Sequence, residues 1–172
     1  MNWKHFLLIG IAFFTTVSIL FFPAIPQDMA YHDFADQRTF FGIPNFFNVI
    51  SNLPYLVFGL IGYFFLFMQA HPEIIKSIKH AYLVFFVGVS MVCFGSGYYH
   101  LFPDNNTLLW DRLPMTLAFM SFFTVIFAEH VHEKTAGRMY LSLLVIGLVS
   151  VVYWYWTESS GAGDLRLYGL RS

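Results

Sequence analysis

The sequence has few charged residues and only one cysteine. Asp, Glu, Lys and Arg make up 11% of its 172 residues, less than half of the roughly 25% that is usual in soluble domains. The single cysteine, Cys93, lies in an apolar run and allows neither an internal disulfide nor a cysteine-rich metal site. Nine basic residues against ten acidic ones leave no charge excess that would attract nucleic acid. We therefore predict that the chain has no nucleic-acid partner.

Hydrophobic residues are abundant instead, at 58% of the chain, and there is no internal repeat or low-complexity tract. A transmembrane helix needs about 20 mostly apolar residues. Five stretches approach that length: 6–25, 46–70, 81–102, 113–128 and 139–156. The first follows Lys4 as in a signal peptide, but it lacks a small-residue cleavage site, which favours a retained anchor. The pattern predicts an all-α fold, a polytopic membrane helix bundle with residues 1–172 in one membrane domain, and Pro54 predicts a kink in the second helix.

The lysines predict the orientation of this bundle in the membrane. In a path of five alternating helices all four lysines fall on one side, together with Arg138; they are Lys4, Lys76, Lys79 and Lys134. Short loops rich in Lys and Arg usually stay in the cytoplasm. We therefore expect a cytoplasmic N-terminus, with the loops 26–45 and 103–112 and the tail from Thr157 on the outer side.

Three reactive side chains are expected near that outer side. Ser96 and His100 are four residues apart, which places them on one face of a helix. Asp111 is expected to open the fourth helix at the same membrane depth, and ionisable groups at this depth are candidates for function. Each residue also has a structural interpretation: Ser96 bonding to a carbonyl of its own helix, His100 reaching the headgroups, and Asp111 favoured by the helix dipole. We predict that the three side chains point into one polar recess.

Further polar residues lie in the loop before the second helix and at the opposite membrane surface. The loop and the adjoining helix start contain His32, Asp33, Asp36, Asn45, Asn48 and Asn52. Their oxygen atoms suit a hard cation such as calcium, although a solvated loop with Asn helix caps explains them equally well. We expect this loop to fold toward the outer end of the third helix. His130 and His132 lie on the cytoplasmic side with divergent side chains, which favours interfacial histidines over a metal site.

Several of these motifs, in this order, resemble the alkaline ceramidase family, and its bacterial members in particular. The motifs are Asn45-Phe-Phe-Asn48-Val-Ile-Ser51-Asn52, Ser96-x-x-x-His100 and Trp110-Asp111-Arg112-Leu113-Pro114-Met115. The segments 31–38 and 42–45 extend the resemblance, which covers about residues 26–170. Because each motif adjoins a hydrophobic stretch, the ordered set is more specific than any one of them.

The resemblance implies a seven-helix, zinc-dependent membrane amidohydrolase that cleaves ceramide-like lipids into a fatty acid and a sphingoid base. Carried onto this sequence, it makes His100 a zinc ligand, has Ser96 steady the developing oxyanion, and has Asp111 orient and deprotonate the zinc-bound water. It also implies a calcium site, which would draw on Asp33, Asp36 and Asn45.

The sequence departs from the family pattern in its C-terminal part. It contains no His-x-x-x-His, so the two C-terminal zinc histidines that the family implies are absent, and only five of seven expected helices are present. His32 is the only other outer-side histidine available to assist His100. We therefore expect a C-terminally truncated copy that binds zinc weakly and is weakly active or inactive. The alternative is a non-catalytic, receptor-like or transport protein whose polar cavity is lined by Ser96, His100 and Asp111.

Overall fold

The computed structural model describes residues 10–11, 14, 17–19, 21–68 and 74–169, and the secondary structure of this part is helical apart from one isolated bridge between Phe40 and Ile43. The all-α prediction is therefore confirmed. In chain order the elements are η1 (Met29–His32), α2 (Phe46–Ile50), α3 (Leu53–Met68), η2 (Lys76–Ile78), α4 (Lys79–Leu101), α5 (Asn105–Phe127), η3 (Ala128–His132), α6 (Glu133–Ser159) and α7 (Arg166–Gly169). The predicted helix at 6–25 lies largely outside the described residues.

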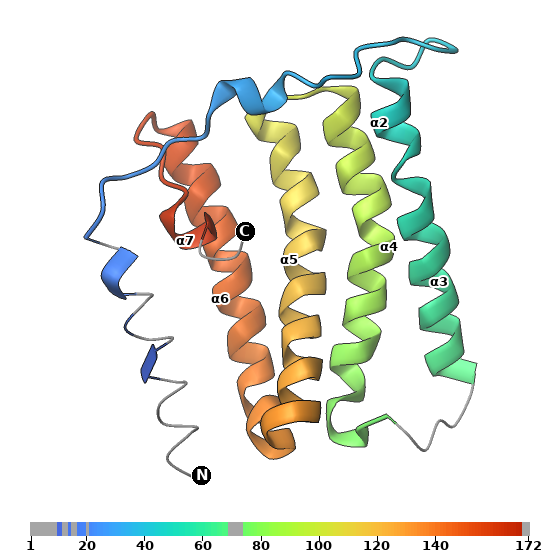
Figure 1. Ribbon diagram of the computed structural model, residues 1–172, viewed down its shortest axis with the longest axis vertical. Helices are drawn as coiled ribbons and strands as arrows, with labels where there is room; N and C mark the ends of the chain where they lie inside the picture. Colours follow the sequence, from blue (N-terminus) through green and yellow to red (C-terminus); the bar gives the residue numbers. More distant parts are fainter. Residues whose placement is uncertain (1–9, 12–13, 15–16, 20, 69–73, 170–172) are drawn as a thin grey trace.

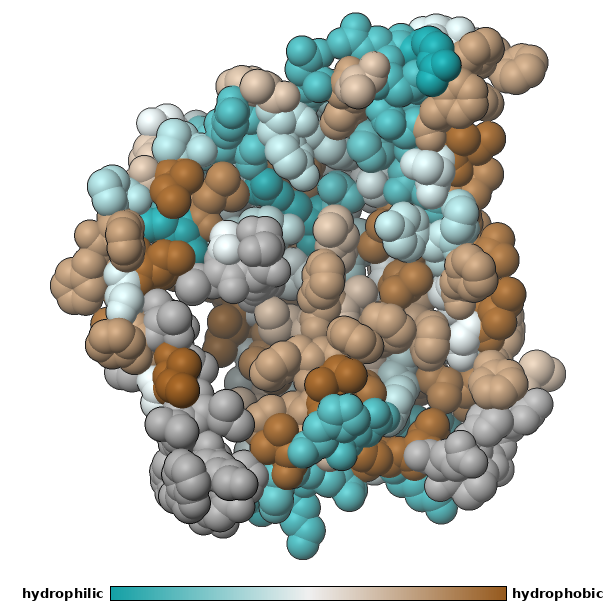
Figure 2. Space-filling model, in the orientation of Figure 1, coloured by the Kyte–Doolittle hydropathy of each residue, from teal (hydrophilic) through white to brown (hydrophobic). Residues whose placement is uncertain are grey.

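Among the described residues, three helical stretches are long and apolar enough to cross a membrane: Phe46–Met68, Lys76–Leu101 and Asn105–Ser159. The third contains α5 and α6, which fold back on each other. Ser121 and Tyr140 hydroxyls lie 3.1 Å apart, and the Tyr155 hydroxyl donates to Asn106 Oδ1 at 3.0 Å, so the two helices run antiparallel. Figure 2 shows hydrophobic residues across the middle of the molecule and hydrophilic ones toward its two ends, as expected of a bilayer-spanning protein.

The long helices stand side by side in a row, in the order α3, α4, α5, α6 (Figure 1). Helix α4 packs against α3 and α5, and α5 packs against α4 and α6. Because successive helices alternate in direction, the end of α4, the start of α5 and the end of α6 lie at one end of the row. We call this the His100 end.

Two helices begin earlier than the hydropathy pattern predicts. Helix α5 begins at Asn105 instead of 113, because Asp104 and Thr107 form a capping box in which the Asp104 carboxylate accepts the Thr107 N–H at 2.7 Å. Helix α6 begins at Glu133 instead of 139, and His132 Nδ1 caps it by accepting the Thr135 N–H at 3.2 Å. These polar first turns are helical although they are not apolar. The expectation that Asp111 opens its helix was therefore wrong: Asp111 lies in the second turn of α5.

The predicted kink at Pro54 is a break between α2 and α3. Proline has no N–H to donate to the carbonyl four residues earlier, here that of Ile50, and α2 ends at that residue. The side chain of Asn52, which is 4% exposed, donates to the Asn48 carbonyl at 2.8 Å. The break is thus held by a side chain that satisfies backbone oxygen within the apolar environment.

Helices α4 and α5 approach each other closely at Gly95. A Cβ atom on Gly95 would lie 2.1 Å from the Trp110 carbonyl oxygen. That carbonyl has no helical donor at position i+4, because the residue there is Pro114. The absent side chain of Gly95 therefore lets the two backbones meet, and Ser96 and Asp111 follow directly after the two residues in contact.

The loop before α2 packs onto the His100 end, as the sequence predicted. His32 Nδ1 lies 2.9 Å from the Tyr99 hydroxyl, the Phe34 ring centroid lies 4.6 Å from that of His100, and the Asn45 amide donates to the His100 carbonyl oxygen at 2.8 Å. These contacts tie the loop to the last turn of α4.

Candidate functional site

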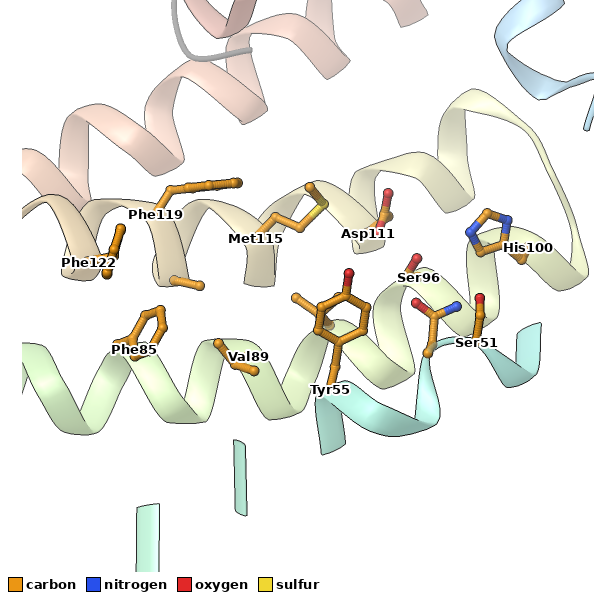
Figure 3. Close-up of a pocket in the computed structure, with 13 residues that line it drawn as sticks. Ser51, Tyr55, Phe85, Val89, Ser96, His100, Asp111, Met115, Phe119 and Phe122 are labelled. Atoms are coloured by element: carbon orange, nitrogen blue, oxygen red, sulfur yellow. The ribbon is translucent and has the colours of Figure 1, made fainter. Parts of the chain in front are cut away.

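A cavity of about 620 Å³ lies between α3, α4 and α5. Its residues separate by chemistry, as Figure 3 shows: polar side chains gather at one end and aromatic side chains at the other. The polar end is formed by Ser51, Asn52, Tyr55, Ser96, His100 and Asp111. The apolar remainder is formed by Phe85, Val89, Val92, Met115, Ala118, Phe119 and Phe122. The cavity is therefore amphipathic along its length.

Ser96, His100 and Asp111 all line this cavity, so the prediction of a shared recess is confirmed. Ser96 and His100 are one turn apart on α4, and Asp111 faces them from α5. Ser96 is 7% exposed and Asp111 is 8% exposed. The Oδ1 atom of the Asp111 carboxyl group is buried and has no hydrogen-bond partner. One carboxylate oxygen is thus free to interact with a molecule in the cavity.

The His100 ring is held in place but one of its nitrogens is free. Phe34 packs on the ring, and Asn45 holds the His100 backbone. The ring Nδ1 atom is buried and has no hydrogen-bond partner. Buried polar atoms are rarely left without partners, so this nitrogen is available to a metal ion or to a polar group of a ligand.

The three residues named for calcium all have partners within the protein. Asp33 Oδ1 accepts from the Gln37 amide at 2.7 Å, and the Asn45 amide donates to the His100 carbonyl. Asp36 forms an ion pair with Arg38, and the hydrogen bond from Arg38 holds the pKa of the Asp36 carboxyl below its usual range. The Ca²⁺ site at these residues stays a prediction.

His32, His130 and His132 do not join His100 at the cavity. His32 uses both ring nitrogens, contacting Tyr99 through Nδ1 and Asn105 Oδ1 through Nε2 at 2.9 Å each, and it does not line the cavity. His130 and His132 are exposed in η3, at the opposite end of the row.

The donors at the cavity do not by themselves make a complete zinc site. His100 Nδ1 and Asp111 Oδ1 are suitable free ligand atoms. The described part of the chain, however, contains no group of three His, Cys, Asp or Glu residues that could hold a metal ion, whereas catalytic zinc usually takes three protein ligands. Zinc binding at His100 therefore stays a prediction.

Two residues at the polar end, Ser51 and Tyr55, were not singled out as site residues from the sequence. The break before Pro54 lies between them, and both line the cavity opposite Ser96 and His100. Pro54 was the available signal, because a proline inside an apolar stretch marks a place where the helix and its side chains change direction.

The row of apolar helices is typical of an α-helical membrane protein. Its internal cavity is amphipathic and contains a serine, a histidine and a carboxylate, which are side chains that can take part in catalysis. A family model described as Ceramidase matches residues 39–163. Since this range covers most of the chain, the protein belongs to the ceramidase family. The matched range includes the whole polar end of the cavity but not Asp33 or Asp36. No curated protein and no solved structure matches the chain.

Proposed function

We propose that the cavity binds a ceramide-like lipid and that the protein is a hydrolase acting on the lipid's amide bond. The two-ended cavity carries this proposal. Its apolar end suits an acyl chain, and its polar end suits an amide and hydroxyl groups. Membership of the ceramidase family independently supports a hydrolase with a lipid substrate.

The residues at the polar end have the properties that amide hydrolysis requires. The free Oδ1 of Asp111 can accept a proton from a water molecule that attacks the amide carbonyl, and can return it to the amine nitrogen as the C–N bond breaks. The Ser96 hydroxyl, which lines the same cavity, can direct its hydrogen to the carbonyl oxygen as negative charge develops there. Tyr55 and Asn52 offer further polar contacts to the substrate.

The proposal includes weak zinc binding. His100 would contribute one ligand through its free Nδ1, and the described residues do not complete the set. After dialysis of the purified chain, we expect well under one zinc per chain and slow or undetectable release of labelled fatty acid from ceramide. One tightly bound zinc per chain would contradict this part of the proposal.

Lipid binding is tested separately from catalysis, by titrating the full-length chain in neutral detergent with a fluorescent ceramide. We expect saturable binding that unlabelled ceramide displaces. The Val92→Trp variant should lose this binding because Val92 is 8% exposed and lines the cavity. The Val152→Trp variant is the matched control, since Val152 is 54% exposed on α6. Equal binding by both variants would exclude the cavity as the lipid site.

The same titration distinguishes the alternative function. The described residues offer too few ligands for a metal ion. If ceramide binds but is never cleaved, this shortage favours a receptor-like or transport protein over an enzyme. Saturable binding with no fatty-acid release, even when zinc is added in excess, would support this alternative. Zinc-stimulated release that disappears in Asp111→Asn would support the hydrolase.

A further inference from the structure

A second cavity, of about 300 Å³, contains a buried arginine that has no direct ion-pair partner among the described residues. The cavity lies between α5, α7 and the segment around Gln27, and Arg112 lines it together with Gln27, Tyr31 and Leu165. Arg112 is 6% exposed. Its guanidinium group lies between two aromatic rings, with its Cζ atom 3.9 Å from the Trp154 ring centroid and 4.4 Å from that of Tyr168.

The hydrogen-bonding capacity of this guanidinium is only partly used. Arg112 Nη2 donates to Gln27 Oε1 at 2.6 Å, whereas the buried Nη1 atom has no partner. The indole Nε1 of Trp154, which is 0% exposed, has no partner either. Within the described residues the ion pairs are Asp36–Arg38 and Asp164–Arg166, so Arg112 has no direct ion-pair partner there, and Asp111 acts on it only through a longer-range electrostatic attraction.

A buried cation without an anion is costly, because its charge is removed from water without compensation. The aromatic rings compensate part of this cost through cation–π contacts. They do not satisfy the Nη1 hydrogen atoms or the indole N–H. The free Nη1 donor and the positive charge of Arg112, which lines the cavity, suit an oxyanion, and a guanidinium matches a carboxylate in shape.

The second cavity adjoins the candidate active site. Asp111 and Met115 line both cavities, so the side chains of these two residues form a shared wall. We propose that the Arg112 cavity binds the carboxylate headgroup of a fatty acid, which makes it a product site. Its identity as the product site rests on the proposed hydrolase function, whereas the carboxylate binding does not.

The charge of Arg112 determines the direction in which a carboxylate product would leave the first cavity. Amide hydrolysis turns a neutral acyl group into a carboxylate. Arg112 attracts this negative charge from the neighbouring cavity, whereas Asp111 lines both cavities and favours neither. Release toward Arg112 would therefore clear the polar end for another substrate.

The test is equilibrium binding of radiolabelled dodecanoate to the full-length chain in neutral detergent. We expect saturable binding that unlabelled dodecanoate displaces and dodecanol does not. Arg112→Gln should weaken it at least about tenfold, the usual effect of losing a charge-assisted hydrogen bond from a buried cation. Arg138→Gln removes an exposed charge and should leave the binding unchanged. Effective displacement by dodecanol would overturn the proposal.

A second variant keeps Arg112, so a loss of binding in it does not result from misfolding caused by removal of the arginine. Gln27→Glu places a carboxylate where Oε1 already accepts from Arg112, so it should raise the melting temperature and abolish dodecanoate binding. Asn106→Asp is the matched control, because it adds a carboxylate at an exposed position of the same end and should retain binding. Unchanged binding in Gln27→Glu would overturn the assignment to Arg112.

Two further measurements identify the ligand and separate this proposal from the proposed function. Dodecyl phosphate should displace dodecanoate less effectively than dodecanoate itself does. Stronger displacement by the phosphate would overturn the carboxylate assignment in favour of a phospholipid headgroup. Ser96→Ala should bind dodecanoate normally whether or not the protein hydrolyses ceramide, and loss of binding in this variant would overturn a separate site at Arg112.

Discussion

Asp164 and Arg112 are both buried charged residues, but only Asp164 has a full set of partners. Asp164 is 4% exposed and pairs with Arg166, whose Nε donates to Oδ1 at 2.8 Å and whose Nη2 donates to Oδ2 at 2.7 Å. The Tyr153 hydroxyl also donates to Oδ2, at 2.9 Å. This set links the chain beyond α6 back to that helix, and it makes the ionised form of Asp164 part of the folded structure.

We predict that Asp164 gives the fold a measurable sensitivity to acid. The hydrogen bonds from Arg166 lower the pKa of Asp164 from 3.8 to about 2. Because the pKa is lower in the folded state, the stabilisation is present above about pH 4 and is lost as pH falls toward 2. A shift of this size corresponds to ~2 kcal/mol in the free energy of unfolding.

The measurement is the unfolding free energy of wild type and Asp164→Asn in detergent, between neutral pH and pH 2. Wild type should be more stable by ~2 kcal/mol at neutral pH, and the difference should shrink as the acid limit is approached. A difference that stays constant over this range would show that the ionised carboxylate does not provide the stabilisation.

How far the site could be predicted differs from residue to residue. Ser96 and His100 were placed together because a spacing of four fixes a helix face whatever the tertiary structure. The partners of His32 were unpredictable, because Tyr99 and Asn105 reach it only after the loop has packed on the helix ends. The surroundings of Arg112 were also unpredictable, because only the fold shows that it stacks between two rings on α6 and α7.

At the scale of helices, the long apolar stretches predicted which segments form the long helices α3 to α6 but not where the helices begin. The hydropathy pattern missed the first turns of α5 and α6 because capping hydrogen bonds, and not apolar side chains, form them. It also gave no information on the distance between helices. That distance depends on single small residues such as Gly95, where a carbonyl of the neighbouring helix fills the space of a side chain.

We predict that Gly95→Ala destabilises the protein and disturbs the cavity. The new Cβ would lie 2.1 Å from the Trp110 carbonyl oxygen, a backbone atom that cannot move without moving α5. Overpacking of this kind costs roughly 1–3 kcal/mol. Thermal unfolding in detergent measures the loss, and ceramide binding should weaken because Ser96 and Asp111 move apart.

Gly97→Ala is the matched control for this prediction. Gly97 lies on the same helix, but a Cβ there meets nothing within 4 Å. Alanine is a better helix former than glycine by about 1 kcal/mol, so Gly97→Ala should keep or raise the melting temperature. If the two variants lose stability equally, close packing at Gly95 is not the cause.

In the whole molecule, the polar residues lie at the two ends of the row of helices (Figure 2), as expected for a protein that spans a membrane. The turn before α4 and the start of α6 lie together, since the Ser77 hydroxyl donates to Glu133 Oε1 at 2.6 Å. Lys76 and Lys134 therefore share one end of the row, as the alternating path predicted. The loop 26–45 lies at the other end (Figure 1), where Asn45 contacts His100, a residue of the polar end of the cavity.

The last prediction concerns the orientation of this row in the bilayer. Lysine-rich ends of membrane proteins are retained in the cytoplasm, so Lys76 should be cytoplasmic, with Asp36 and the polar end of the cavity on the outer side. Single-cysteine variants at these two positions, in a Cys93→Ala background, can be labelled on intact cells with a membrane-impermeant maleimide. Asp36→Cys should react at once, and Lys76→Cys only after the membrane is permeabilised. The reverse pattern would place the polar end of the cavity, and any product released beside Arg112, on the cytoplasmic side. Because Lys76 is exposed in the structure, lack of labelling there on intact cells would reflect the membrane barrier and not burial within the protein.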